Sequence, residues 1–413
     1  MKLLIDFGAS RIKSTVVNSV DSKITNIFET EGSIFNDSKG SIKLNFFKNN
    51  MIKHLDFYYK NKIKIDKILA CGEMHCFGIE SNINKVNSDK FYLWRFNHYK
   101  TSQSIKELKE YDLDNKTNMS LRDGLPSVNL YSFLQDLDDI KIRLLTFPQI
   151  LFNEKTNYIN RSMGHSLGIY SINNNLVKPF NDFNNIEYPE IVNDDDNLIL
   201  GNIESNNHQI PLTCFIGDLQ AACLGSNLCE DDLLLNIGTG SQIISFFQGK
   251  FSFGKELRPY FKNNLLECIT HIPAGRHFTN WCNHLIDIND FIKSDKIFWE
   301  ILKNLNINDL YNVKNLIDFP FDNKKFISVN NNDELKNFLT SLTKSFLDQY
   351  ISILKNHVHH FKNIKISGGI IDRIPVARDY LSKNLDKEIL TLNNSGILTL
   401  IGLKEMLSFQ NET

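Results

Sequence analysis

The sequence predicts an α/β protein with two related domains. At 413 residues the chain is too long for one ordinary hydrophobic core. Its first strand pattern, LLIDFGAS at 3–10, is echoed by LLLNIGTG at 233–240. Because the two patterns begin the two halves of the chain, they indicate two domains of one design. The polar stretch LCEDD before the second pattern places the boundary between 1–229 and 230–413.

The individual elements follow from the spacing of apolar residues. Each of the two stretches passes through glycines into a second apolar run, 12–17 or 242–247, so each predicts a β-hairpin. The other strands expected in the first half are 68–71 and 198–202. The second half adds a helical pattern over 334–360, a strand over 364–367, a helix after Pro375 and a last helix near 396–407.

Composition and charge narrow the functional classes. Hydrophobic residues make up 42% of the chain and charged residues 23%, as in a soluble globular protein. A formal net charge of −2 argues against nucleic acid or an anionic membrane as a partner. The first apolar run is too short for a signal peptide, and no run approaches the ~18 residues of a membrane span. Seven cysteines without a C-x-x-C pair predict reduced thiols in a cytoplasmic protein.

The stretch FIGDLQAACLG at 215–225 places one carboxylate, Asp218, inside an apolar run. Gly217 is expected to end a strand, and a helix is expected to start near Gln220. One interpretation makes Asp218 the helix N-cap, accepting from free N–H groups of the first turn. The other makes it a catalytic base at the mouth of a cleft. The two are compatible, and the helix start is expected to keep the carboxylate ionised.

Glycine turns supply candidate phosphate sites. Successive backbone N–H groups in a tight turn suit phosphate oxygens. Ser10 and Thr239 add hydroxyl groups to the two hairpins, and Lys13 adds a positive charge. Asp6, at the end of the first strand, suits Mg²⁺, with a turn residue as the alternative. In KISGGIIDRIP at 365–375, the paired glycines allow a purine or ribose to approach the backbone, with a simple strand-to-helix turn as the alternative that the segment alone favours.

A second polar group follows a predicted strand in ACGEMHCFGI at 70–79. Glu73, Met74 and His75 come together where that strand ends. Side chains at strand ends commonly line ligand sites in α/β sheets. For an isolated histidine, a satisfied and partly buried side chain is the alternative.

Two other groups are interpreted as structural. Cys71 and Cys76 flank the GEMH segment and suit packing better than nucleophilic chemistry. The HVHH run at 357–360 lacks supporting cysteine or carboxylate spacing. It is therefore interpreted as a solvated cluster at the end of a helix rather than a metal site.

Five motifs in order resemble the FGGY-type carbohydrate kinases of the actin-like, hexokinase-like ATPase superfamily. They are IDFGASRIK, GEMH, GDLQAA, NIGTGSQ and SGGIIDRIP. ELRPYF at 256–261, HIPAGRHF at 271–278, Gln220 and Gln242 look most similar to the sedoheptulokinase branch. The resemblance implies two ribonuclease-H-like domains flanking a central cleft. Sugar would be bound mainly by the first domain and ATP mainly by the second.

The resemblance also implies roles for individual residues. Asp218 matches the family's catalytic aspartate, and Asp6 and Asp218 match a Mg²⁺ site. The residues implied for ATP are Gly8, Ser10, Lys13, Gly238, Thr239, Gly240, Gly368, Gly369 and Arg373. Those implied for the sugar are Met74, His75, Trp94, Arg95, Asp218 and Gln220.

Several positions depart from the family pattern. Ala9 stands where threonine is usual, which removes one hydroxyl donor, and Glu73 stands where glutamine is usual. The sugar-contacting Trp-x-Asp-x-Arg segment is replaced by LWRFNHY at 93–99, with its arginine directly after its tryptophan and no aspartate. GLPSVNLYSF at 124–133 lacks the usual lysine and tryptophan. These departures affect sugar identity more than ATP chemistry.

The resulting prediction is an ATP-dependent sugar kinase that uses Mg²⁺. It would transfer the γ-phosphate to a hydroxyl of a ketose, with sedoheptulose favoured and xylulose or another pentulose next. The alternatives are an inactive relative that acts as a nucleotide- or sugar-binding regulator and an actin-like polymerising ATPase. The expected partner is a small-molecule sugar, and neither nucleic acid nor a membrane is expected to bind. A homodimer is possible.

Overall fold

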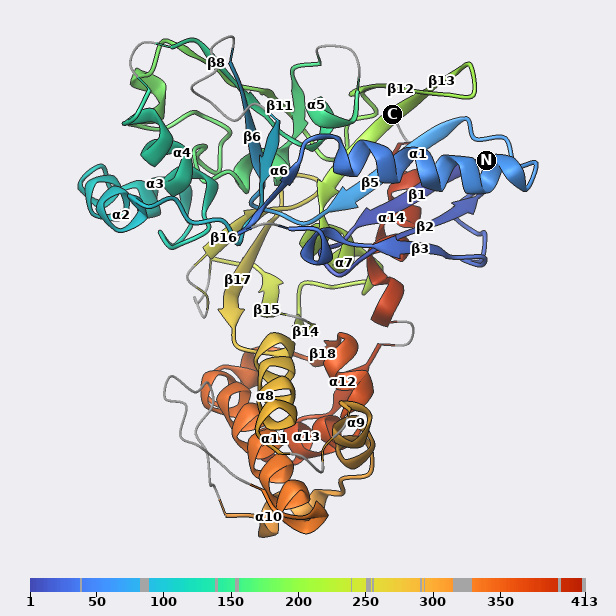
Figure 1. Cartoon of the computed structure of the whole chain (residues 1–413), viewed down its shortest axis with the longest axis vertical. Coiled ribbons are helices and arrows are strands. Elements are labelled where there is room, and N and C mark those ends of the chain that lie inside the picture. The colour runs from blue at the N-terminus through green and yellow to red at the C-terminus, as the bar shows by residue number, and fades with distance from the viewer. Residues whose placement is uncertain are drawn as a thin grey trace. The chain divides into compact units, whose positions relative to one another are not determined.

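The computed structural model divides into two compact units (Figure 1). It describes residues 1–37, 39–81, 89–137, 140–152, 156–238, 240–249, 254, 256–289, 292, 294–314, 329–392 and 395–410. Unit 1 comprises Met1–Asn227, Lys255–Leu266 and Ile397–Thr413, and unit 2 comprises Leu228–Gly254 and Glu267–Gly396. Two segments beyond the predicted boundary therefore belong to unit 1, so the units are not two continuous halves.

The main sheet of unit 1 carries the first predicted hairpin. Its strand order is β12-β13-β5-β1-β2-β3. The strands are β1 (Lys2–Phe7), β2 (Arg11–Val17), β3 (Phe28–Glu31), β5 (Lys67–Gly72), β12 (Gly201–Ser205) and β13 (His208–Gly217). β1 is antiparallel to β2 and parallel to β5, and β13 is parallel to β5. The strands β1, β5 and β13 therefore end at the same edge of the sheet.

Further elements of unit 1 surround that sheet. A second sheet has the order β10-β8-β6-β7-β4, and β11 pairs with β9. These strands are β4 (Ser41–Lys43), β6 (Phe77–Ser81), β7 (Lys90–Tyr92), β8 (Ile142–Leu145), β9 (Tyr158–Asn160), β10 (Ile186–Glu187) and β11 (Glu190–Val192), with β16 (Glu256–Pro259) also in unit 1. The helices are α1 (Asn45–Lys60), α2 (Thr101–Glu110), α3 (Leu113–Thr117), α4 (Pro126–Leu134), α5 (Phe147–Leu151), α6 (Arg161–His165), α7 (Asp218–Gly225) and α14 (Leu398–Phe409).

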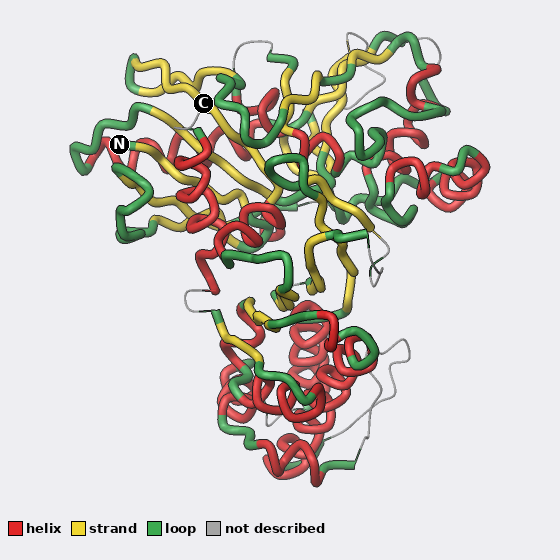
Figure 2. The backbone as a smooth tube through the Cα atoms, turned by 180° about the vertical axis from the view of Figure 1, so that it is seen from behind, coloured by secondary structure: helices red, strands yellow, loops and turns green. Residues whose placement is uncertain are grey.

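Unit 2 contains the second predicted hairpin. Its strands lie in the order β17-β15-β14-β18-β19. They are β14 (Asp232–Ile237), β15 (Ser241–Phe246), β17 (Leu265–Ile272), β18 (Asn363–Ser367) and β19 (Ile389–Thr391). The helices are α8 (Gly275–Ile288), α9 (Lys296–Lys303), α10 (Ile307–Asn312), α11 (Asn332–Leu354), α12 (Gly369–Arg373) and α13 (Val376–Leu385). Figure 2 shows these helices, in red, clustered together.

Hydrophobic burial explains why the helices of unit 2 pack on its sheet. Leu235 of β14 and Ile366 of β18 are fully buried in one cluster with Phe278 of α8 and with Phe346 and Tyr350 of α11. Burying each large apolar side chain stabilises the fold by roughly 1.5–3 kcal/mol. The cluster therefore holds the strands of unit 2 rigidly behind the turns that follow them.

Most of the expected elements are present, with three shifts. The strand expected at 198–202 begins at Gly201, because Leu198 and Ile199 are exposed. The helical pattern over 334–360 ends as a helix at Leu354, and Val358–His360 forms a separate 3₁₀ turn. The last helix begins at Leu398. No helix in the described ranges has the length and apolar character needed to cross a membrane.

Candidate active site

Three carboxylates gather at one edge of the main sheet of unit 1. Asp6 lies near the end of β1, Glu73 follows β5 and Asp218 follows β13. The register pairs Asp6 with Cys71 and Gly217 with Gly72. Ligands commonly bind beyond the carboxyl ends of parallel strands. Parallel pairing thus brings together residues that lie more than 200 positions apart in the sequence.

Asp218 begins helix α7 but does not cap it. The N-cap is Gly217, and the Asp218 carboxylate accepts only from the adjacent Leu219 N–H, at 2.8 Å, among the described backbone and side-chain donors. The N-cap interpretation is therefore wrong. Burial raises the pKa of Asp218 to about 7, with the negative charges of Asp6 and Glu73 adding to the effect. The expectation that the helix start keeps this carboxylate ionised is therefore wrong, because burial and the two neighbouring carboxylates outweigh the helix start.

The Asp6 carboxylate is held by elements outside its own turn. Its Oδ2 accepts from the Thr399 hydroxyl of α14 at 2.7 Å, and its Oδ1 accepts from the Cys71 thiol at 3.6 Å. Asp6 is 9% exposed, and burial raises its pKa, an effect that these bonds and the charge of Lys13 oppose. One fixed carboxylate suits Mg²⁺, which proteins hold through one or two carboxylates together with phosphate oxygens and water.

Two departures from the family pattern compensate each other. Arg95 Nη1 lies 3.3 Å from Glu73 Oε2, and Trp94 Nε1 donates to the same oxygen at 3.0 Å. Arg95 Nε also donates to Asp37 at 2.7 Å, and the Ser33 hydroxyl donates to Glu73 Oε1. A buried carboxylate needs such a partner. Arg95 therefore offsets part, but not all, of the effect by which burial raises the pKa of Glu73.

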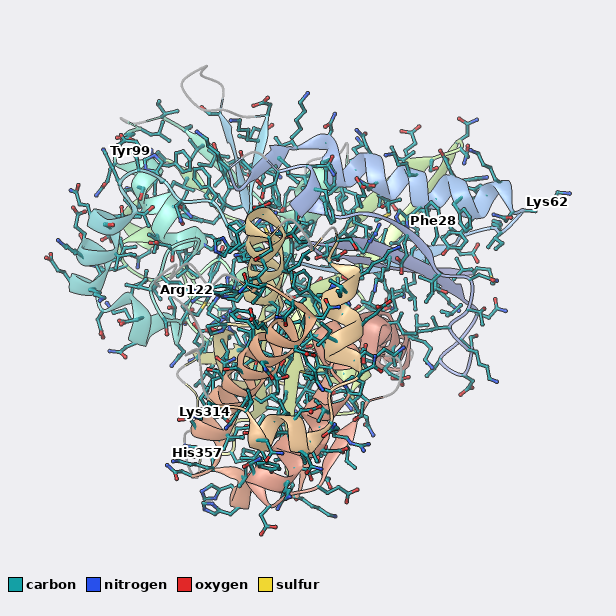
Figure 3. All side chains as sticks on the ribbon, turned by 60° about the horizontal axis from the view of Figure 1, so that its bottom comes forward. Phe28, Lys62, Tyr99, Arg122, Lys314 and His357 are labelled. Atoms are coloured by element: carbon teal, nitrogen blue, oxygen red, sulfur yellow. The ribbon has the colours of Figure 1, made fainter. Side chains whose placement is uncertain are left out.

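His75 lies beside two arginines joined by one glutamate. Its ring Nδ1 lies 2.7 Å from the Ser166 carbonyl, so Nδ1 is the protonated nitrogen and Nε2 is an acceptor. That Nε2 faces Arg122 Nη2 at 3.4 Å and Arg258 Nη2 at 3.5 Å. Glu256 bonds to Arg122 at 2.9 Å and to Arg258 at 2.5 Å. Figure 3 marks Arg122 among the side chains.

Met74 and Gln220 meet at Gly217. A Cβ on Gly217 would lie 2.4 Å from Gln220 Oε1 and 2.9 Å from Met74 Sδ, so both side-chain ends reach this position and would have to shift if it carried a side chain. Gln220 Nε2 donates to the Pro259 carbonyl at 2.9 Å. Gln220 Oε1 is buried and has no hydrogen-bond partner among the described residues. The structure thus brings both residues to the start of α7, beside Asp218.

The first hairpin turn is closed tightly. A Cβ on Gly8 would lie 2.8 Å from the Arg11 carbonyl, so the turn itself requires glycine. The carbonyls of Ala9 and Ser10 accept from backbone N–H groups at 2.9 and 3.2 Å in the loop after β3. Lys13 lies opposite Asp6 in the strand ladder. The turn is therefore preorganised.

The glycine turns of unit 2 face open space. Among the described residues, a Cβ on Gly240 or Gly369 would meet no atom within 4 Å, and one on Gly238 would meet a carbonyl at 3.8 Å. The Gly275 N–H at the start of α8 donates to the Gly238 carbonyl at 3.1 Å, which ties the two segments together. Such bare backbone lets a bulky ligand approach closely. Thr239 lies outside the described residues.

Gly368 has a different role from its neighbour. Its φ of +112° disfavours other residues, and a Cβ there would lie 2.2 Å from the Ile237 carbonyl. Gly368 thus allows β18 to turn against the end of β14. Arg373, at the end of α12, stacks its guanidinium 4.4 Å from the centre of the Trp299 ring.

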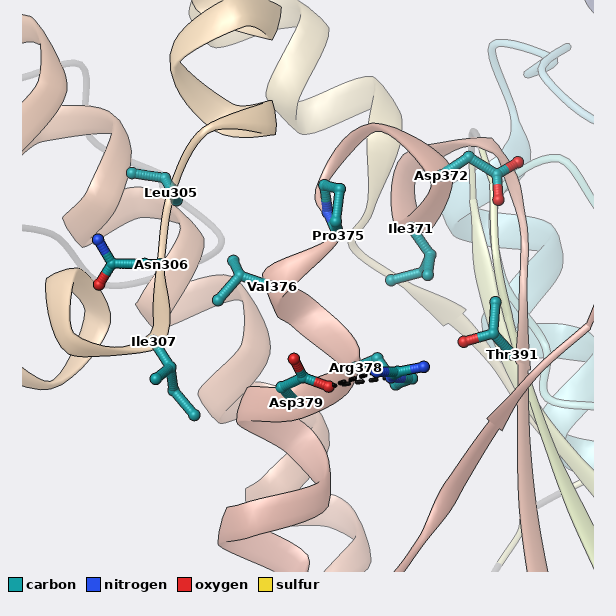
Figure 4. Close-up of a pocket in the computed structure, with 10 residues that line it drawn as sticks. All are labelled: Leu305, Asn306, Ile307, Ile371, Asp372, Pro375, Val376, Arg378, Asp379 and Thr391. Atoms are coloured by element: carbon teal, nitrogen blue, oxygen red, sulfur yellow. Dashed lines mark hydrogen bonds and ion pairs between the residues drawn. The ribbon is translucent and has the colours of Figure 1, made fainter.

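A cavity of about 660 Å³ lies beside α12 (Figure 4). It is lined by Leu305, Asn306, Ile307, Ile371, Asp372, Pro375, Val376, Arg378, Asp379 and Thr391. Arg378 and Asp379 pair with each other at 2.8 Å. The lining also includes Asp372 of α12, so its three charged side chains carry one net negative charge.

The residues interpreted as structural agree with their surroundings. Burial raises the thiol pKa of Cys71 and of Cys76 well above the usual range, so neither suits a nucleophile. The rings of His359 and His360 lie tilted against each other in the 3₁₀ turn, with centres 3.9 Å apart and an interplanar angle of 41°. Within the described ranges, no three or more His, Cys, Asp or Glu residues are grouped to bind a metal ion.

Comparisons with known proteins place this geometry in a known fold. No protein-family model and no curated protein sequence matches the chain. A gluconate kinase structure from Lactobacillus acidophilus matches with a TM-score of 0.74 and 14% identity, covering 98% of this chain and 89% of that one. A ligand-bound xylulose kinase from the same organism matches with a TM-score of 0.71 and 15% identity, covering 99% of this chain and 92% of that one. The structure of Plasmodium falciparum glycerol kinase with ADP matches with a TM-score of 0.73 and 15% identity, covering 100% of this chain and 90% of that one.

The chain has the fold of these kinases. The α/β class and the two-domain architecture predicted from the sequence are confirmed by this fold. At these identities the likeness establishes the sugar-kinase fold, and the chemistry is argued below from the residues.

Four residues of the site in this sugar-kinase fold escaped the sequence reasoning. Glu256 and Arg258 lie in ELRPYF, where the sequence pattern assigns no role to the charges, and Arg122 lies two residues before the segment GLPSVNLYSF at 124–133. Thr399 bonds to Asp6 from the last helix, and nothing in its sequence context signals that contact. Only the folded chain brings these side chains to the edge of the sheet.

Proposed function

We propose that the chain is an ATP-dependent kinase that phosphorylates a hydroxyl group of a ketose. The observation that carries this proposal is Asp218, a carboxylate with a pKa of about 7 at the edge of a sheet in a sugar-kinase fold. A base with a pKa near the working pH is well suited to accept a proton from a hydroxyl group. Sedoheptulose is the favoured ketose, on the motif resemblance, and xylulose is next.

Each group at the edge of the sheet has a place in this proposal. Asp218 accepts the proton of the attacking hydroxyl. His75, Met74 and Gln220 contact the sugar, and Arg95 and Trp94 hold Glu73 in place. Phosphoryl transfer needs mainly alignment and charge stabilisation, so fixed polar groups suffice. The hydrogen bonds that fix the Glu73 carboxylate and the His75 ring near Asp218 support this arrangement.

ATP and Mg²⁺ are the implied cofactors. When bound, they supply the phosphoryl group and the positive charge that offsets its negative charge. The open backbone of Gly238, Gly240 and Gly369 fits the phosphates and the ribose, and the first hairpin, with Ser10 and Lys13, offers further donors. Asp6 would hold the metal ion.

Turnover with a panel of sugars tests the proposal. ADP release is measured with purified protein, ATP and Mg²⁺, with xylulose, sedoheptulose, aldoses and polyols each added in turn. We expect at least one ketose to raise ADP release well above the sugar-free rate. If the protein binds ATP but no sugar raises ADP release, the kinase proposal is rejected and the nucleotide- or sugar-binding regulator is favoured. Ala9, which removes a hydroxyl donor from the first hairpin, is consistent with that alternative.

A further inference from the structure

We propose that Ser162 positions Asp218, the proposed base, and that Asp194 orients the hydroxyl group of Ser162. The inference rests on the proposed kinase function and deepens it, because the position of Asp218 affects turnover only if Asp218 takes the proton of a sugar hydroxyl. Ser162 and Asp194 are not among the proposed sugar contacts, so both are positioning residues. A chain of buried hydrogen bonds leads from Asp194 to the residue before Asp218.

The end of strand β13 is bonded by side chains from a separate segment. The neighbouring strand β12 pairs with the first half of β13. Near the other end of β13, the Phe215 N–H donates to Asn160 Oδ1 at 2.7 Å, and the Gly217 N–H donates to Ser162 Oγ at 3.1 Å. Both acceptor side chains are buried. These bonds fix the strand at the point where the chain leaves the sheet for Asp218.

Asp194 fixes the direction in which the Ser162 hydroxyl group points. The hydroxyl donates to Asp194 Oδ1 at 2.9 Å, and the Ser162 N–H donates to the two carboxylate oxygens at 3.0 and 3.2 Å. Asp194 is 2% exposed. Because the hydroxyl hydrogen points to Asp194, the lone pairs of Oγ remain for the Gly217 N–H. Ser162 thus donates on one side and accepts on the other.

Two short parallel strands bring these residues together. β9 ends at Asn160 and β11 ends at Val192, and these two residues are partners in the ladder. Ser162 and Asp194 each follow two positions after the paired residues. Asn160 Nδ2 also donates to the Asn193 carbonyl at 3.1 Å, which ties the two segments together beyond the strands. The place of Ser162 is therefore set by the backbone on both sides.

The helix that carries Ser162 is also anchored at its other end. Helix α6 is followed by Ser166, whose carbonyl lies 2.7 Å from Nδ1 of His75. His75 comes shortly after β5, the strand that pairs with β13. The two ends of α6 therefore bond to residues at the ends of two neighbouring strands. This double attachment keeps Ser162 from moving away with its helix.

The bond matters because it acts on a glycine. Gly217 lacks a Cβ, so its backbone has more conformational freedom than that of other residues. It is extended, with φ −66° and ψ 143°, immediately before the helix that begins at Asp218. A bond to its N–H restrains this backbone and with it the direction in which Asp218 leaves the strand. A displacement of about 1 Å in a reacting group can lower a rate by ~10²-fold.

Ser162→Ala tests whether this bond supports turnover. The variant should fold, because the pairing of β13 with β5 remains. Turnover is measured with whichever of xylulose and sedoheptulose the wild type uses better. We expect kcat to fall by at least ~10-fold and KM to change by less than ~3-fold, because the proposed sugar contacts are kept. A folded variant with a kcat close to that of wild type, or with a loss confined to KM, overturns the inference.

Ser104→Ala is the matched control. Ser104 is also fully buried, and its hydroxyl bonds to the Ser132 hydroxyl at 2.7 Å between α2 and α4. Each of the two variants removes one buried hydroxyl, so both should lower the melting temperature. Only Ser162→Ala should lower kcat. An equal loss of kcat in both variants would assign the effect to lost stability and overturn the inference.

Asp194→Asn tests the second part of the proposal. The amide oxygen of asparagine can still accept from Ser162 but is a weaker acceptor than a carboxylate. We expect kcat to fall by less than in Ser162→Ala. Because Asp194 acts through Ser162, the double variant should be no slower than Ser162→Ala alone. An unchanged kcat in Asp194→Asn, or losses that multiply in the double variant, contradict the role of Asp194.

Backbone hydrogen exchange separates failure of this inference from failure of the proposed function. Mass spectrometry of a peptide spanning 215–225 measures exchange without sugar or nucleotide. We expect the Gly217 N–H in this peptide to exchange at least ~10-fold faster in Ser162→Ala and at the wild-type rate in Ser104→Ala. Faster exchange supports the restraint on Gly217 even when no sugar stimulates ADP release by wild type, an outcome that rejects the kinase. Unchanged exchange overturns the inference even when the kinase proposal stands.

Discussion

At the scale of single residues, the surroundings of Asp218 decide its chemistry. A helix start favours a carboxylate charge by about 0.3–1 kcal/mol, which would lower a pKa by less than about one unit. Burial beside other carboxylates can raise a pKa by several units. The larger effect wins, and the pKa of Asp218 rises to about 7. The residue is therefore ready to exchange a proton near neutral pH.

Replacing Asp218 separates a base from a structural residue. Asp218→Asn should reduce sugar-dependent ADP release by roughly 10²–10⁴-fold, as loss of a general base does, while sugar binding is retained. The raised pKa means that the charged form destabilises the fold above pH 7, a penalty that disappears as pH falls toward the ordinary carboxyl value. The melting temperature of the variant at pH 8 should therefore equal or exceed that of wild type. Full turnover in the folded variant would reject the base.

The pH dependence of turnover should report the same carboxylate. We expect kcat/KM to rise with pH through about 7, because Asp218 accepts a proton only when ionised. Glu73→Gln removes one charge that raises this pKa, so the rise should move to lower pH. The amide oxygen of the new residue can still accept from Trp94 and Arg95. Glu204→Gln, which removes an exposed carboxylate on β12, is the control and should leave the profile unchanged. A profile that does not move in Glu73→Gln would contradict the coupling.

At the scale of elements, Gly368 and Gly369, which follow β18, have different structural roles. Gly368 adopts a left-handed φ and packs against the Ile237 carbonyl, whereas Gly369 faces open space. The strand thus turns sharply at one glycine and leaves backbone bare at the next. The hairpin between β14 and β15 presents Gly238 and Gly240 in the same bare form.

Alanine at these glycines should separate folding from nucleotide binding. Gly368→Ala should lower the free energy of unfolding by at least about 1 kcal/mol, because it adds backbone strain and a clash. Gly240→Ala should leave the melting temperature unchanged and raise the KM for ATP, since its methyl group would point into open space. Thermal melting and ATP titration measure the two effects. A Gly240→Ala variant with unchanged ATP affinity would place the phosphates elsewhere.

At the scale of the whole molecule, the end of the chain returns to unit 1. Helix α14 packs against α7, and Figure 1 shows it in red beside the blue strands β1 and β2. The contact is close, since a Cβ on Gly402 would lie 1.9 Å from the Ala221 carbonyl and one on Gly225 would lie 2.0 Å from the Leu398 carbonyl. Thr399 of the same helix bonds to Asp6. Helix α14 thus supports two carboxylates of the site.

Separating α14 from α7 should weaken both stability and activity. Gly402→Val forces the helices apart, so the melting temperature and sugar-dependent ADP release should both fall. Overpacking of this kind typically lowers the free energy of unfolding by about 1–3 kcal/mol. Glu405→Ala, at a half-buried position of the same helix whose side chain pairs with the neighbouring Lys404 at 3.4 Å, is the control and should change neither quantity by much. A stable and fully active Gly402→Val would show that this contact does not support the site.

Local patterns identified much of the fold and part of the site. The two hairpins, the strand before Glu73 and the start of α7 follow from short-range apolar and glycine patterns, which depend on neighbouring residues. Asp6, His75 and Asp218 were found because each stands at the end of such a pattern. The predicted C-terminal end of the helix over 334–360 was wrong, because the apolar spacing continues past Leu354, where the helix ends, into the 3₁₀ turn.

The sequence by itself determined the α/β class, the two related hairpins and the candidate carboxylates, because strand periodicity and glycine turns are local properties. The tertiary structure alone decided which charges face one another. It paired Glu73 with Arg95, joined Arg122 and Arg258 through Glu256, and brought Thr399 to Asp6. These contacts join segments far apart in the chain, and their electrostatic effect depends on burial and distance, which no local pattern encodes.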